Sequence, residues 1–153
     1  MCAPRLDAAP AARDGAPVTR QVYYPKRLPE AVAGQVGFAP AVRAGDWLFV
    51  SGLSGVFVED DKLAIPETAA AQATSILVHL RDLLEAAGGS LDDVVDLTIL
   101  LRPDVTDAQV MEIGKALGAG FKPKSHADTW LRTALVGPSQ QLLQVKAVAH
   151  LAR

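Results

Sequence analysis

Residues 68–101 read TAAAQATSILVHLRDLLEAAGGSLDDVVDLTILL, and the two halves of this segment have different hydrophobic periods. Apolar residues in the first half recur at helical spacing: Ile76, Leu80, Leu83, Leu84 and Ala87. Such a stripe is typical of a helix with one buried face, and Gly88-Gly89 ends it. The second half alternates, as a strand does: Val95, Leu97, Ile99 and Leu101 against Asp96, Thr98 and Leu100. The segment therefore predicts a helix over 68–87 followed by a strand over 95–101.

Shorter patterns on both sides of this segment predict the other elements. The expected strands are Val18–Tyr24, Trp47–Val50, Val56–Val58, Thr129–Val136 and Leu142–Leu151, and a second helix is expected over Thr106–Leu117. The strand at Val56–Val58 is expected to return beside Trp47–Val50 as a hairpin, after Gly52 and Gly55. The order is then β-β-β-α-β-α-β-β, which indicates an α+β fold.

Two amphipathic helices are too few to cover both faces of such a sheet, so both should pack on one face. Apolar residues nevertheless occur at both strand parities: Leu100, Leu131, Leu142 and Val148. We therefore expect the other sheet face to be buried in an oligomer.

Composition limits the class of protein. A chain of 153 residues that is 50% hydrophobic suggests a single domain with a real core. Residues 1–17 are rich in Ala, Pro, Arg and Asp without a period, so we expect a disordered leader there and a single domain over 18–153. Cys2 is the only cysteine of the sequence, so the fold cannot depend on an internal disulfide.

Charge and hydropathy limit the kinds of partner that this protein is expected to bind. Fifteen Lys and Arg residues against 17 Asp and Glu give a net charge of -2, which argues against a general nucleic-acid binder. No apolar stretch approaches the roughly 20 residues that span a membrane, and the N-terminus lacks the apolar region of a signal peptide. We therefore expect a cytoplasmic protein with no membrane partner.

The stretch APAVRAGDWLFVSG at residues 39–52 resembles the Rid (YjgF) family, whose members typically carry A-V-x-A-G-D-L-L-F-V-S-G here. Similar matches follow at Ala71-Gln72, at LLEAAGG (83–89), at SLDDVV (90–95) and at VKAVA (145–149). The resemblance covers about residues 18–153. It implies a chorismate-mutase-like fold, with a mixed sheet, two helices on one face, and a homotrimer with clefts between subunits. The element order read from the sequence agrees with that fold.

The resemblance also implies a chemistry. Family members of the best-known kind hydrolyse 2-imino or enamine acids to a 2-keto acid and ammonia, with no metal or organic cofactor. An arginine binds the substrate carboxylate, a glutamate positions water or moves a proton, and a tyrosine hydroxyl and backbone groups complete the site. The backbone groups correspond to those near Ser51 and Gly52.

This sequence departs from that pattern at each charged position. A gapless alignment places Thr129 at the arginine, whereas an alignment anchored on Pro123 places Ser125 there and needs an insertion of four residues. Gln144 falls at the glutamate and Phe38 at the tyrosine. Gln144, Thr129 and Phe38 are therefore the candidate catalytic residues, although Thr129 and Phe38 could also be plain strand and core residues.

Five further residues are candidate substrate-binding groups, and no metal ligand is expected: Ser51, Gly52, Leu131, His126 and Arg132. His126, with Lys122 and Lys124, could bind an anion or could belong to a solvated loop. Arg132 lies three residues after Thr129 and should point to the opposite face, unless a bulge intervenes.

Three functional hypotheses follow. The first is a divergent Rid-type enzyme, a hydrolase or related tailoring enzyme acting on an imine, enamine or other reactive carbonyl compound. Because loss of a general acid/base group typically costs about 10²–10⁴ in rate, this enzyme should be a poor 2-imino acid deaminase. The second is a non-catalytic trimer that binds a small molecule in the same cleft. The third is the RNA-cleaving role sometimes assigned to the family, against which the acidic balance and the lack of a histidine pair argue.

Overall fold

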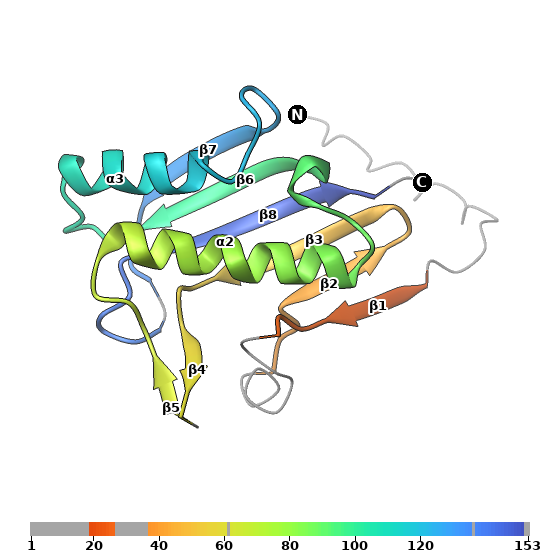
Figure 1. Ribbon diagram of the computed structural model, residues 1–153, viewed down its shortest axis with the longest axis horizontal. Coiled ribbons are helices and arrows are strands. Elements are labelled where there is room, and N and C mark those ends of the chain that lie inside the picture. The colour runs from red at the N-terminus through yellow and green to blue at the C-terminus, as the bar shows by residue number, and fades with distance from the viewer. Residues whose placement is uncertain (1–18, 27–36, 61, 136, 152–153) are drawn as a thin grey trace, which may run out of the picture.

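The computed structural model describes residues 19–26, 37–60, 62–135 and 137–151, so the expected leader at 1–17 lies outside the described residues. Six strands form the main sheet in the order β1-β2-β3-β8-β6-β7 (Figure 1). They are β1 (Arg20–Tyr23), β2 (Ala41–Ala44), β3 (Trp47–Leu53), β6 (Val94–Leu101), β7 (Ala127–Arg132) and β8 (Leu143–His150). Only β6 and β7 pair in parallel among these strands, which confirms a mixed sheet.

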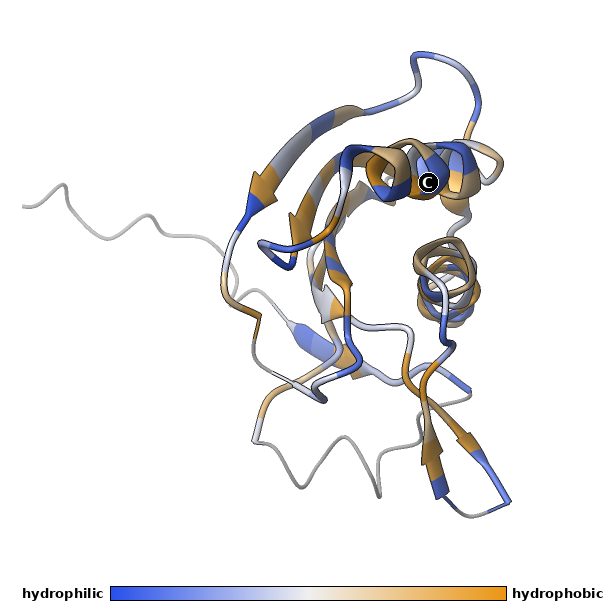
Figure 2. Ribbon diagram, turned by 90° about the vertical axis from the view of Figure 1, so that its left-hand side faces the viewer, coloured by the Kyte–Doolittle hydropathy of each residue, from blue (hydrophilic) through white to orange (hydrophobic). Residues whose placement is uncertain are grey.

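Both long helices pack on the same face of this sheet, as predicted (Figure 2). Helix α2 spans Ala69–Ala86 and helix α3 spans Asp107–Gly118, with a short 3₁₀ turn, η2, at Leu91–Asp93. The Thr68 hydroxyl accepts a hydrogen bond from the Ala71 amide (3.2 Å) and so caps the first turn of α2. Gly88, with φ of +82°, takes the chain out of the helix. Among the described residues, no helix is long and apolar enough to cross a membrane.

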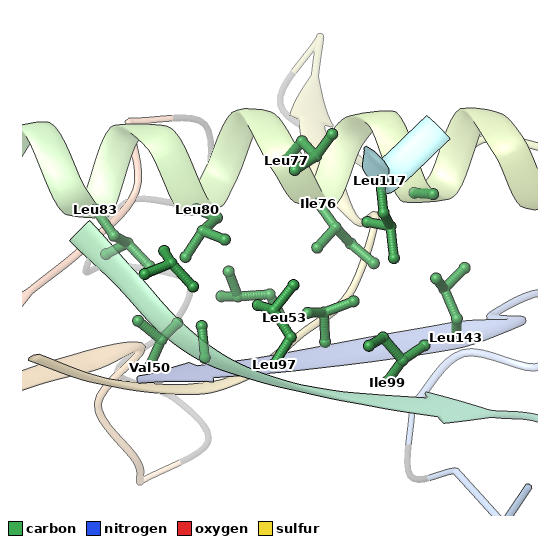
Figure 3. Packing of buried hydrophobic residues seen from close by; sticks show 14 of the residues in the cluster. Val50, Leu53, Ile76, Leu77, Leu80, Leu83, Leu97, Ile99, Leu117 and Leu143 are labelled. Atoms are coloured by element: carbon green, nitrogen blue, oxygen red, sulfur yellow. The ribbon is translucent and has the colours of Figure 1, made fainter. Parts of the chain in front are cut away.

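The core lies between the helices and the sheet. All members of the predicted apolar stripe of α2 are buried: Ile76, Leu80, Leu83, Leu84 and Ala87. Figure 3 shows this stripe facing Val50, Leu97 and Ile99 of the sheet. The start of β6 differs from prediction, because Val94 is fully buried and Val95 is exposed. The pairing of β6 with β8 shifts register between Val94 and Asp96, which moves Val95 out of the alternation.

Two elements of the first half differ from the predicted order. β4 (Phe57–Glu59) does not return along β3, because it pairs with β5 (Lys62–Ala64) in a separate two-stranded sheet. The partner of β3 is instead β2, which the sequence did not predict. Gly45, with φ of +62°, provides the two-residue turn that closes this hairpin. In the second half, β7 ends at Arg132 rather than at Val136.

A buried glutamine of α2 joins the segment before α2 to the segment before β8. The Gln72 side chain is fully buried, and its Nε2 donates to the carbonyls of Pro66 (2.8 Å) and Gln140 (2.9 Å). Its Oε1 accepts from the Leu142 amide (2.8 Å). A Cβ at Gly55 would lie only 3.0 Å from Gln72 Cα, so the loop after β3 approaches α2 at this point. One side chain of α2 therefore holds the segment that leads into β8.

Replacing Gln72 with alanine is expected to lower the free energy of unfolding by about 3 kcal/mol or more. The change leaves two backbone carbonyls and one amide without their partner, and each buried unsatisfied group costs about 1–3 kcal/mol. Chemical denaturation of both proteins measures the loss. Thr74→Ala is the matched control, because Thr74 lies on the exposed side of α2 and bonds only within it. A Gln72→Ala variant as stable as Thr74→Ala would show that the linkage contributes nothing.

Candidate functional site

The sheet face opposite the helices carries most of the candidate residues. In β3, β6 and β8, side chains on this face alternate with buried residues, and the β6–β7 register extends the face to β7. We call it the open face. On the four neighbouring strands β3, β8, β6 and β7 it includes the following residues: Trp47, Phe49, Ser51, Gly52, Asp96, Thr98, Leu100, Thr129, Leu131, Gln144, Lys146, Val148 and His150. No helix covers it in the described chain (Figure 2).

A bulge in β3 shapes the centre of the open face. Val50 pairs with Ala147, but Leu53 pairs with Val145, so Ser51 and Gly52 together lie opposite a single residue of β8. A Cβ at Gly52 would lie 3.1 Å from Oε1 of Gln144. Glycine therefore lets the backbone of the bulge approach the Gln144 amide closely.

Ser51 ties this bulge to the segment before β2. Its hydroxyl donates to the carbonyl of Ala39 (2.7 Å), and its amide donates to the carbonyl of Pro40 (2.9 Å). Because the hydroxyl proton is used in this way, its oxygen lone pairs remain able to accept a bond from a ligand. Phe38 directly precedes this segment and is 54% exposed. Within one chain, Phe38 is therefore not a core residue.

Two rows of paired residues connect Gln144 with the candidate residues of β7. One row runs from Gln144 through Leu100 to Leu131. The next row ends at Thr129, which pairs with Thr98. Neighbouring strands lie about 4.8 Å apart and successive residues about 3.3 Å apart, so the backbones that carry Gln144 and Thr129, two strands and two residues apart, are separated by about 12 Å. A small molecule on this face could contact both side chains, although the two do not touch.

Arg132 lies on the other side of the sheet, as predicted from its spacing to Thr129. It pairs with Leu101, whose side chain is buried under the helices, and the β6–β7 register has no bulge. Its guanidinium donates to Oδ1 of Asp107 (2.7 Å) and to the carbonyl of Val105. Arg132 thus holds the start of α3. Arg132 and its neighbour Leu131 also line a hollow of about 160 Å³.

His126 is not brought to Gln144 within one chain. Its ring packs against that of Phe121, with centroids 4.5 Å apart, and its Nδ1 lies 3.2 Å from the Ser125 hydroxyl. Phe121 itself packs against the core. His126 precedes the first residue of β7, which pairs with Asp96, whereas Gln144 pairs with Leu100 four residues further along β6.

The loop before β7 separates the other groups of the predicted anion site. Lys122 forms an ion pair with Asp92 (2.5 Å), and Lys124 occupies a left-handed turn with φ of +60°. Ser125, the alternative match to the family arginine, lies in this loop, whereas Thr129 lies within β7 on the open face.

Sequence reasoning missed Lys146 and Thr98, which form one row of the open face. The sequence does carry a pattern that predicts the orientation of Lys146, because its neighbours Val145 and Ala147 are apolar and the strand alternates. The alternation that places Gln144 on one face places Lys146 there too.

An ion pair follows the end of β6, where Arg102 also links this segment to the one before β8. The Arg102 guanidinium contacts both carboxylate oxygens of Asp104 (2.5 and 3.0 Å) and donates to the Ser139 carbonyl (2.6 Å). Hydrogen bonding to Arg102 lowers the pKa of the Asp104 carboxyl. The described part of the chain has no cluster of three or more His, Cys, Asp or Glu side chains that could hold a metal ion.

Comparison with known proteins gives a consistent result. Residues 29–151 match the family model described as endoribonuclease L-PSP. The 3-aminoacrylate deaminase RutC of Acinetobacter baylyi is 30% identical over 131 residues, which cover 86% of this chain and 98% of RutC. A RutC family protein of Pyrococcus horikoshii is 25% identical over 132 residues, with coverage of 86% and 98%.

Solved structures show the same fold. The YjgF gene product of E. coli superposes with a TM-score of 0.69 at 20% identity, covering 85% of this chain and 98% of that protein. RidA of the Antarctic bacterium Psychrobacter superposes with a TM-score of 0.65 at 23% identity, covering 74% and 88%. Because the family model spans residues 29–151 of a 153-residue chain, this protein belongs to the endoribonuclease L-PSP family, the family of the YjgF and RidA proteins.

Proposed function

We propose that this protein acts on a small imine, enamine or other reactive carbonyl compound on the open face, without a metal or organic cofactor, and that it hydrolyses the imines and enamines. The observation that carries the proposal is the bulge of β3, where the Gly52 backbone meets the Gln144 amide, with Thr129 on the same face. The similarity to a 3-aminoacrylate deaminase supports it, since that relative's named substrate is an enamine.

The chemistry requires addition of water to an imine carbon. An enamine first takes a proton on carbon to become the imine, water then adds to the C=N carbon, and the resulting carbinolamine expels ammonia to leave a carbonyl. An amide cannot act as a carboxylate base, but Gln144 can both donate to and accept from a water molecule or a carbonyl. Ser51 offers an acceptor oxygen beside it. With solvent carrying the protons, turnover should be about 10²–10⁴ below that of a glutamate-bearing site.

We further propose that the protein is a homotrimer whose subunits bury the open face and border the clefts. Trp47, Phe49 and Leu131 are large apolar side chains that remain exposed on this face in one chain, and apolar patches of this kind mark interaction surfaces. The number of subunits and a cytoplasmic location stay predictions that rest on the family resemblance and on the sequence.

Light scattering at micromolar concentration is expected to give a mass near three times 16.1 kDa. Phe49→Asp should lower this mass, because it puts a charge where we expect a subunit contact and Phe49 is 47% exposed in the single chain. Met111→Asp is the matched control, because Met111 is 65% exposed on α3, away from the open face. A native mass near 16.1 kDa would contradict the assembly.

Gln144→Ala should reduce turnover at least about tenfold on whichever imine, enamine or carbonyl compound the native protein converts best, because the group that orients water is lost. Across a substrate panel, ammonia release measures this for imines and enamines, and loss of the substrate measures it for carbonyl compounds. Gln140→Ala is the control, since Gln140 is exposed in the loop before β8 and only its backbone carbonyl is used. Unchanged turnover in Gln144→Ala would contradict the proposal. Another outcome is that no panel compound is converted but one of them raises the melting temperature of the native protein and not that of Gln144→Ala. The protein would then be a non-catalytic binding protein, which is the alternative predicted from the sequence.

Thr129→Arg combined with Gln144→Glu is expected to raise hydrolysis of 2-iminopropanoate above the weak native level, because it supplies a carboxylate-binding fork and a base. A coupled keto-acid assay measures this. Ser125→Arg combined with Gln144→Glu tests the other alignment on the same assay. If hydrolysis rises only in the Ser125→Arg protein, the position of the family arginine corresponds to Ser125. If the native protein already hydrolyses 2-iminopropanoate as fast as an arginine-bearing relative, another cation serves the site.

A further inference from the structure

A hollow of about 300 Å³ lies where β1 and β2 pair at the edge of the sheet, and its lining residues are Thr19, Gln21, Arg43 and Gly45. Gln21 pairs with Arg43, and Arg43 pairs in turn with Leu48, which is fully buried in the core. Side chains paired across neighbouring strands share a face, so Gln21 and Arg43 lie on the helix side of the sheet. The hollow is therefore separated by the sheet from the open face and from the subunit contacts proposed there.

Two backbone carbonyls hold the Arg43 guanidinium at one side of this hollow. Its Nε donates to the carbonyl of Gly45 (2.9 Å), and its Nη1 donates to that of Ala87 at the end of α2 (2.9 Å). Helix α2 has no basic residue in its last turn, so Arg43 supplies the cation that meets its C-terminal end. These bonds give Arg43 a structural role, and they also fix the position of its charge.

Arg43 has hydrogen-bonding capacity that the described chain does not use. A guanidinium has five N–H groups, and two backbone carbonyls take up two of them. None of the ion pairs among the described residues includes Arg43. Glu85, in the last turn of α2, pairs with Lys26 instead. The remaining N–H groups and the positive charge are therefore available to a ligand.

The other lining residues also suit an anion. Gln21 brings a side-chain amide and Thr19 a hydroxyl, and both can donate hydrogen bonds. Gly45 has a φ of +62°, and a Cβ there would meet no atom within 4 Å, so the turn leaves open space beside Arg43. None of the described residues that line the hollow is acidic. The hollow thus combines a fixed cation with two kinds of neutral donor.

We propose that this hollow binds the phosphate group of a small molecule. Guanidinium groups bind phosphate through charge-assisted hydrogen bonds, and the amide and the hydroxyl can bind oxygens that the guanidinium leaves. A phosphate group presents three strong acceptor oxygens and nearly two negative charges, which three kinds of donor match better than they match a carboxylate. The hollow is at the small end of the range for ligand pockets. Because this site is not on the open face, the inference is independent of the proposed function.

The test is a titration of the isotope-labelled native protein with inorganic phosphate, at neutral pH and constant ionic strength, followed by amide chemical shifts. Saturable shifts at millimolar phosphate are expected at Gln21, Arg43 and Gly45, and acetate should bind at least about tenfold more weakly. Arg43→Gln should weaken phosphate binding at least about tenfold, because charge-assisted hydrogen bonds are lost. Gln21→Ala should weaken it about threefold or more, because one neutral donor is lost.

The two variants and a control separate binding from folding. Arg43→Gln also removes two bonds to backbone carbonyls, so circular dichroism must first show that it folds. Gln21→Ala tests the hollow without touching those bonds. Arg20→Gln is the matched control, because Arg20 is next to Gln21 on β1 but pairs with Ala44 and so points to the other face. It should bind phosphate as the native protein does.

Absence of saturable shifts at millimolar phosphate would overturn the inference, as would shifts that cluster away from β1 and β2. Native-like phosphate binding by folded Arg43→Gln, or by Gln21→Ala, would overturn it as well. Equal affinity for acetate and phosphate would contradict the assignment of a phosphate site. A loss in Arg20→Gln as large as that in Gln21→Ala would show that phosphate responds only to the general charge of this edge. If Arg43→Gln does not fold, the outcome with Gln21→Ala decides.

Discussion

The packing of α2 and α3 against one face of a six-stranded sheet is the constraint on which the rest of this structure depends. Alternate residues of β3, β6 and β8 are drawn into the core by that contact, and Leu97, Ile99 and Val145 illustrate how completely they are buried. The intervening residues must then face away from the helices. One-sided cover therefore determines both where the core lies and where polar groups can gather outside it. It also leaves large apolar side chains such as Phe49 uncovered in a single chain.

The bulge in β3 turns this uncovered face from a flat surface into a candidate site. It sets two residues, Ser51 and Gly52, opposite Lys146, and it brings the Gly52 backbone against the Gln144 amide. Bulges commonly re-aim backbone and side chains next to functional sites. Gln72 of α2 holds the segment before β8 through hydrogen bonds with Gln140 and Leu142. The site is thus built on strands that pack on the core through their other face and whose pairing is regular on both sides of the bulge.

The sequence predicted the parts of the fold that have long, regular periods. The stripe of α2, the alternation of β6 from Leu97 to Leu101 and the one-sided helix cover follow from such patterns, and the structure confirms them. β2 escaped prediction because Ala41–Ala44 is short and has two alanines, so its strand character comes from pairing with β3 across the Gly45 turn. The pairing of β4 with β5 could not be read either, because a short apolar run does not specify its partner.

The candidate site was predictable to a similar degree. Strand alternation placed Thr129 and Arg132 on opposite faces, which the β6–β7 register confirms. The sequence could not show that the His126 ring packs on Phe121, because that contact forms between loop residues. Lys146 was not among the predicted site residues, although strand alternation places it on the same face as Gln144.

Amide chemical shifts measured during titration with a small 2-oxo acid test most directly whether the open face is the ligand site. The account predicts that the largest shifts occur at Gly52, Thr98 and Gln144, on three neighbouring strands, while α3 stays unchanged. Shifts concentrated instead around the hollow lined by Val110, Trp130 and Arg132 would contradict it, because they would place the ligand on the helix side of the sheet.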